Sequence, residues 1–136
     1  MGQTPSNSVI EAITSVLSED ARVLFAYLYG SAARGEDGND IDIAVFAAEG
    51  AEGHNLSADL KVALHKRIDL PPDAFDVRIL NGLAEGGDIF GLLYLKNVLS
   101  GTQLLVDRNP DVRAEFIERY GTHFRECEGL MEEVLA

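Results

Sequence analysis

The chain has 136 residues, 46% of them hydrophobic and 25% charged, which suits one folded domain with a modest core. Its 23 acidic and 11 basic residues give a net charge of −12, which disfavours direct binding to nucleic acid. The single cysteine, Cys127, excludes an internal disulfide and a cysteine-rich zinc site. It fits a reducing compartment, so we expect a cytoplasmic protein. No apolar run approaches the ~20 residues that span a membrane, so we expect no membrane association.

Apolar spacing and turn residues predict the first elements of the chain. Residues 8–18 carry apolar side chains at helical spacing. Residues 23–29 and 41–47 are rich in β-branched and aromatic side chains and are typical of strands. The polar, glycine-containing segment 49–55 indicates a loop, and 56–67 an amphipathic helix.

The second half of the chain alternates in the same way. It predicts a strand at 74–80, a loop at 81–87, an almost wholly apolar helix at 89–99, a short strand at 102–106 and a long helix after Asn109-Pro110. We find no internal repeat and no linker. The order α-β-β-α-β-α-(β)-α therefore predicts a single domain over residues 1–136. Its class is α/β (α+β), with a small mixed sheet flanked by helices.

The lengths of the connections predict how the strands pair. Only about ten residues join the first two strands, whereas a parallel crossover needs a dozen or more, so these strands should be antiparallel. The helix after the second strand is long enough for a right-handed crossover, so the third strand can run parallel to the second. This arrangement places Gly30 and Ser31 beside Asp40 and Asp42, with Asp76 near the start of the neighbouring strand.

Three carboxylates that converge on one point suggest a metal site. Asp40 and Asp42 are two residues apart, so their side chains point to one face of the sheet. Three such anions cannot all stay ionised without compensation, and Mg²⁺ with oxygen ligands supplies it. Two ions would clamp a phosphoryl transfer. Gly30 lets the backbone approach a phosphate closely, and the Ser31 hydroxyl can hold the terminal phosphates of a nucleotide.

Simpler interpretations of these residues stay open at this stage. The Asp-x-Asp pair would also suit a solvated turn. Asp73 is the rival of Asp76, although its position before the strand favours a turn or cap. Arg34 pairs either with a substrate or with a local acid such as Glu36. The three histidines have no partner at ligand spacing, so structural roles are favoured for them.

The pattern resembles the DNA polymerase β-like nucleotidyltransferase superfamily. More narrowly, it is similar to the minimal nucleotidyltransferases that pair with HEPN toxins in prokaryotic toxin–antitoxin systems. Their motif is Gly-Ser-x-x-Arg-Gly, a spacer, and Asp-x-Asp with a third acid on a later strand. The spacer here has eight residues instead of the usual ten. The shorter loop affects how the base and the triphosphate are bound, but it does not change the metal ligands. The matching residues are Gly30, Ser31, Arg34, Gly35, Asp40, Asp42 and Asp76.

The resemblance implies the polymerase β-like nucleotidyltransferase fold and a transfer of AMP from ATP with two Mg²⁺ ions. Asp40 and Asp42 would hold both ions. Asp76 would complete one metal site and draw the proton from an incoming hydroxyl. The narrower resemblance implies a HEPN RNase toxin as acceptor, modified on a tyrosine, so that this protein acts as its antitoxin. The implied nucleotide-binding residues are Gly30, Ser31 and Arg34.

Two other functions compete with this interpretation. The short spacer favours a protein that neutralises its partner by docking without catalysis, and the third candidate is a small-molecule adenylyltransferase. The C-terminal helix, about 110–135, bears on partners because it carries a long apolar stripe. Its last residues, 131–135, extend beyond so small a core, which predicts contact with another chain, either a partner or a second copy.

Overall fold

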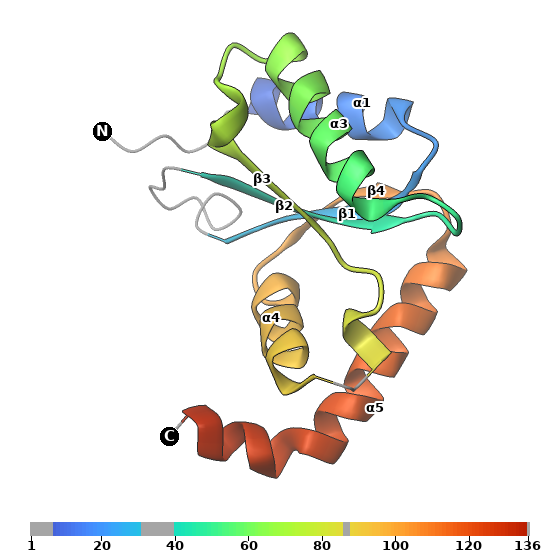
Figure 1. Ribbon diagram of the computed structural model, residues 1–136, viewed down its shortest axis with the longest axis vertical. Coiled ribbons are helices and arrows are strands. Elements are labelled where there is room, and N and C mark those ends of the chain that lie inside the picture. The colour runs from blue at the N-terminus through green and yellow to red at the C-terminus, as the bar shows by residue number, and fades with distance from the viewer. Residues whose placement is uncertain (1–6, 31–39, 86–87, 136) are drawn as a thin grey trace.

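The computed structural model describes residues 7–30, 40–85 and 88–135. Figure 1 shows a central sheet with α1 and α3 on one side and α4 and α5 on the other. This architecture confirms the predicted fold class and order of elements. The helices and strands are α1 (Asn7–Glu19), β1 (Val23–Tyr29), β2 (Ile41–Ala47), α3 (Gly53–Arg67), β3 (Phe75–Ile79), α4 (Ile89–Leu99), β4 (Gln103–Asp107) and α5 (Pro110–Leu135), with short 3₁₀ helices at Pro72–Ala74 and Leu83–Glu85.

The four strands form a mixed sheet in the order β3-β2-β1-β4. β2 is antiparallel to β1 and parallel to β3, as the connection lengths predict, and β4 is antiparallel to β1. α3 supplies the crossover between β2 and β3. β2 is therefore flanked by β1 on one side and β3 on the other, so a residue of β2 has neighbours from both strands.

The two faces of the sheet bury different kinds of side chain. The face under α1 and α3 is mainly aliphatic, with contributions from alternate strand residues such as Ile43 and Val77. The opposite face is rich in aromatic rings, and Phe25 stacks on Phe46 with ring centroids 4.9 Å apart. Because successive strand residues alternate between faces, Asp42 and Asp76 lie on the aromatic side with α4 and α5.

Several element boundaries differ from the sequence prediction by one to three residues, and two of these differences have a clear local cause. α3 begins at Gly53, inside the segment expected to be loop, because the Glu52 carboxylate accepts hydrogen bonds from the backbone N–H groups of His54 and Asn55. β3 begins at Phe75, one residue later than expected, because the 3₁₀ helix Pro72–Ala74 occupies the preceding turn. Both differences reflect local capping and turn geometry, and neither changes the topology.

The long helix α5 leaves the sheet after its first turns. Phe116 is buried against the aromatic face, whereas Tyr120 and Phe124 contact each other and the Lys96 ammonium of α4 lies 5.7 Å from the Phe124 ring. Figure 1 shows the rest of α5 running past the sheet and alongside α4. Leu130 is 56% exposed on this stretch. Contact between residues 131–135 and another chain stays a prediction. In the part of the chain that the structure describes, no helix has both the length and the apolar character needed to cross a bilayer.

Asn81 continues the sheet with its side chain where β3 ends. Its carboxamide accepts a hydrogen bond from Ala47 N at 2.8 Å and donates one to Ala47 O at 2.9 Å. Asn81→Ala should therefore lower the free energy of unfolding by roughly 1–2 kcal/mol, because both backbone groups lose their partner. Urea denaturation measures the loss. Asn97→Ala, at an exposed position of α4, should change stability by less than about 0.5 kcal/mol, and equal losses in the two variants would contradict the assignment.

Candidate active site

Asp42 and Asp76 occupy paired positions of two neighbouring strands. In the parallel register of β2 and β3, Asp42 lies directly opposite Asp76. Asp40 is exposed just before β2. The pKa of Asp42 is raised, first by burial and then by the negative charges of Asp76 and Asp40. The structure thus places the three predicted acids at the same end of the sheet, where the charges of Asp76 and Asp40 disfavour ionisation of Asp42.

Gly30 lies against the Asp42 carboxylate. It follows Tyr29, which pairs with Asp42 in the β1–β2 ladder, and its φ of +76° belongs to the left-handed region that favours glycine. A Cβ placed on Gly30 would be 2.5 Å from Oδ2 of Asp42. Gly30 therefore makes room for a carboxylate of the site itself, in addition to the phosphate contact that the sequence predicts. Ser31, Arg34 and Gly35 lie outside the described residues, and their contacts with nucleotide stay predictions.

Arg78 and two tyrosines complete one wall of the site, and none of the three was predicted as a site residue from the sequence. Arg78 Nε lies 3.3 Å from Oδ2 of Asp76, and its guanidinium carbon is 5.6 Å from the centroid of the Tyr94 ring. The hydroxyl groups of Tyr94 and Tyr29 are 2.7 Å apart. The alternation in β3 offers a signal for Arg78, since it shares the face of Asp76. The contact between Tyr29 and Tyr94 joins residues 65 positions apart and leaves no such signal.

Burial shapes the electrostatics of this wall. It raises the pKa of Tyr29, with further contributions from the hydrogen bond to Tyr94 and from the charges of Asp42 and Asp76. The pKa of Tyr94 is also raised by burial. The charge of Asp76 raises the pKa of Arg78. Both tyrosines therefore stay neutral around physiological pH, and Arg78 provides positive charge on the side of Asp76.

The donor set fits a divalent cation. Carboxylate oxygens are the ligands that Mg²⁺ prefers. The pKa of Asp42 is raised by burial and then by the charges of Asp76 and Asp40, and a bound cation would favour its ionised form. Within residues 7–30, 40–85 and 88–135, no three His, Cys, Asp or Glu side chains are grouped closely enough to hold an ion as they stand. The ion pair with Arg78 neutralises Asp76 in this arrangement. A bound cation would therefore take the place of Arg78 in neutralising the negative charge of Asp76.

Arg78→Met should strengthen metal binding in the absence of nucleotide. The substitution removes a positive charge that competes with the ion for Asp76, and an exposed ion pair of this kind contributes up to about 1 kcal/mol, so we expect Mn²⁺ to bind roughly two- to fivefold more tightly. Titration followed by electron paramagnetic resonance measures the affinity. Arg119→Met is the matched control, because Arg119 pairs with Glu85 and Glu115 instead. An equal change in both variants would contradict the assignment.

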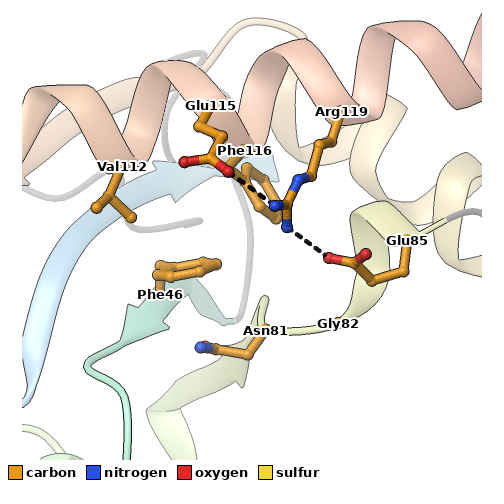
Figure 2. A pocket seen from close by; sticks show the side chains of 8 residues that line it. All are labelled: Phe46, Asn81, Gly82, Glu85, Val112, Glu115, Phe116 and Arg119. Carbon is orange, nitrogen blue, oxygen red and sulfur yellow. Dashed lines mark hydrogen bonds and ion pairs between the residues drawn. The ribbon is translucent and has the colours of Figure 1, made fainter.

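A hollow of about 290 Å³ lies at the end of β2 that is remote from Asp42 (Figure 2). Arg119 on its α5 wall forms ion pairs with Glu85 at 3.1 Å and Glu115 at 2.7 Å. Phe46 lines the hollow four residues after Asp42, a separation of about 13 Å along a strand. The hollow is therefore separate from the carboxylates. The charge of Arg119 is already matched by Glu115 on the same helix and by Glu85, which links α5 to the turn after β3.

The side chains of His65 and His123 each have a backbone partner. Nδ1 of His65 lies 2.9 Å from the backbone oxygen of Leu70, and Nδ1 of His123 lies 2.7 Å from that of Ala84. Asp73, the rival of Asp76, lies in the 3₁₀ helix before β3 and is exposed. None of these three side chains belongs to the wall of the carboxylate site.

Comparison with known proteins shows the family of the fold. The profile of the family described as Polymerase beta, Nucleotidyltransferase matches residues 11–111. No curated protein matches the chain. Several solved structures share its fold, including three toxin–antitoxin structures. A toxin–antitoxin structure with AMP-PNP has a TM-score of 0.63 and 22% identity, covering 93% of this chain and 98% of that one. A tri-AMPylated Shewanella oneidensis HEPN toxin in complex with MNT antitoxin has a TM-score of 0.60 and 20% identity, covering 95% and 98%.

The third structure, of the toxin–antitoxin MntA-HepT, has a TM-score of 0.60 and 19% identity and covers 96% of this chain and 100% of that one. The family profile spans most of the chain, from α1 to the first turn of α5. The matched segment contains Gly30 and all three carboxylates. The protein therefore belongs to the polymerase β nucleotidyltransferase family.

Proposed function

We propose that the protein transfers AMP from ATP to a hydroxyl group of a HEPN-type toxin in the cytoplasm and thereby acts as its antitoxin. The observation that carries this proposal is the placement of Asp42 opposite Asp76 and against Gly30. The structures of similar fold support the choice of donor and acceptor, since one contains AMP-PNP and another a tri-AMPylated HEPN toxin with an MNT antitoxin.

The chain would bind the nucleotide at the end of β1. Gly30 and Ser31 would hold the β- and γ-phosphates through backbone N–H groups and the Ser31 hydroxyl, and Arg34 would add positive charge. Asp40, Asp42 and Asp76 would hold two Mg²⁺ ions. When bound, these ions would supply the positive charge that stabilises the reacting phosphoryl group and the leaving pyrophosphate.

Asp76 would act as the general base of the transfer. Its carboxylate would take the proton of the incoming hydroxyl, whose oxygen then forms a bond to the α-phosphorus while the bond to pyrophosphate breaks. Tyr29 and Tyr94 would keep water from one side of the reacting groups, because Tyr29 is buried and the partly buried Tyr94 hydrogen-bonds to it. The proton would remain on Asp76 until the product leaves.

Intact-mass spectrometry of the partner tests the proposal. The protein is mixed with ATP, Mg²⁺ and the protein encoded by the neighbouring gene. We expect the partner to gain the mass of one or more AMP units, and EDTA to prevent the gain. Tight binding without a mass gain would replace the proposal with neutralisation by docking alone. AMP transfer only to small hydroxyl compounds would replace it with a small-molecule adenylyltransferase.

A further inference from the structure

A wide hollow opens directly beside the carboxylate site. It measures about 580 Å³ and lies between β3, the turn after it and α4. Arg78 belongs to both places, because it lines the hollow and pairs with Asp76. A group that occupies the hollow therefore contacts the side chain that pairs with Asp76. The lining residues are Arg78, Ile79, Leu83, Asp88, Phe90 and Tyr94.

Phe90 presents an apolar ring to solvent at the rim of this hollow. Its side chain is 67% exposed, more than the other exposed large apolar residues of the described chain, Val62, Leu104 and Leu130. The backbone beneath it is fixed, since Oδ1 of Asp88 accepts a hydrogen bond from Phe90 N at 2.9 Å and caps α4. Single exposed apolar residues are common on proteins, but this one lies in a concave surface that leads to reactive groups.

The chemistry of the lining favours an aromatic group on a polypeptide. Phe90 and Tyr94 offer ring faces and edges for aromatic packing, and the Arg78 guanidinium already lies over the Tyr94 ring. Aromatic side chains are enriched among the residues that dominate contacts between proteins, so an exposed phenyl ring beside the site suits a polypeptide acceptor. The hollow is open to solvent, so a segment of another chain can lie in it.

We propose that this hollow receives the acceptor-bearing segment of the protein partner, and that Phe90 is the positioning residue for it. The tyrosine that accepts AMP packs on Phe90 and Tyr94, and its hydroxyl reaches Asp76 past Arg78. This inference rests on the proposed function and adds to it the surface that selects an aromatic acceptor. Phe90 contacts the acceptor segment but none of the reacting atoms, so it determines affinity and placement and leaves the phosphoryl chemistry to the carboxylates.

Steady-state AMP transfer with Phe90→Ala tests the inference. We expect the KM for the partner protein to rise about tenfold or more, as for an aromatic anchor, while kcat at saturating partner and the KM for ATP change less than about twofold. Phe90→Tyr should restore a KM close to that of the wild type. Val62→Ala removes a comparably exposed apolar side chain from α3, on the other side of the sheet, and should leave all constants unchanged.

The outcomes separate this inference from the function on which it rests. If the wild-type protein transfers no AMP to the partner, the proposed function fails and the inference falls with it. If the wild type is active and Phe90→Ala has the same KM as Val62→Ala, only the inference is overturned. A reduced kcat or a raised KM for ATP in a folded Phe90→Ala variant would also overturn it, because the residue would then act on the nucleotide site. Circular dichroism verifies folding.

Discussion

Asp42→Asn should abolish AMP transfer, with kcat falling about 10³-fold or more. Asp42 is the acid with neighbours on both sides, Tyr29 across β1 and Asp76 across β3. The amide has the same shape but no charge with which to hold a cation, so the transferring phosphoryl group loses its compensation. Mass spectrometry of the partner measures the rate. Asp73→Asn, on the exposed 3₁₀ helix, should retain activity within about twofold, and equal losses in both variants would contradict the site.

The same substitution should raise the stability of the metal-free protein at neutral pH. Burial and the neighbouring acids raise the pKa of Asp42 in the folded state, so folding favours its protonated form. That favourable contribution is present at low pH and is lost as the pH rises through the folded-state pKa. The neutral asparagine should therefore be more stable than the wild type at pH 7 in EDTA, and the advantage should shrink towards pH 3. Urea denaturation at both pH values measures it, and a less stable variant at pH 7 would contradict the electrostatic account.

Gly30→Ala should lower kcat about 10²-fold or more and also reduce the stability of the fold. The alanine Cβ would be 2.5 Å from Oδ2 of Asp42, so the carboxylate or the turn must move, and small displacements of catalytic groups reduce rates by such factors. The positive φ adds a cost of about 1–2 kcal/mol to the folded state. Activity assays and urea denaturation measure the two effects.

Gly50→Ala is the matched control for this variant. Gly50 has a φ of +85°, yet a Cβ there would meet no atom within 4 Å. It should lose a similar amount of stability from the backbone alone and keep its activity. If Gly30→Ala were as active as Gly50→Ala, the contact between residue 30 and Asp42 would have no catalytic importance.

Alternation and connection length were enough to predict how β1, β2 and β3 pair, whereas the place of β4 beside β1 was not predicted. The bounds of β1 and β2 follow from their apolar runs, and the crossover through α3 explains why β3 is parallel to β2. The start of α3 was predicted late because glutamate is not a favoured capping residue, so Glu52 gave no signal. Local composition therefore predicts strands better than it predicts the turns that join them.

The walls of the site were harder to predict than the acids. Asp42 and Asp76 could be placed together because each lies near the start of one of two neighbouring parallel strands, and the alternation of apolar residues sets which face each acid takes. The contact of Tyr94 with Tyr29 depends instead on how α4 is rotated against the sheet. That rotation depends on the fit of buried side chains such as Leu95 and Val98 across the core, and no local pattern encodes it.

The lateral pairing of β2 with β3 also constrains how this protein can change during evolution. Insertions or deletions in the segment that links the two strands leave the distance between Asp42 and Asp76 intact, because backbone hydrogen bonds maintain it. One additional residue inside β3 before Asp76 would turn that acid towards the aliphatic face of the sheet. It would bring an apolar neighbour to the face that carries the site. Natural variation in length should therefore accumulate outside the two strands, whose own lengths are far less free to vary.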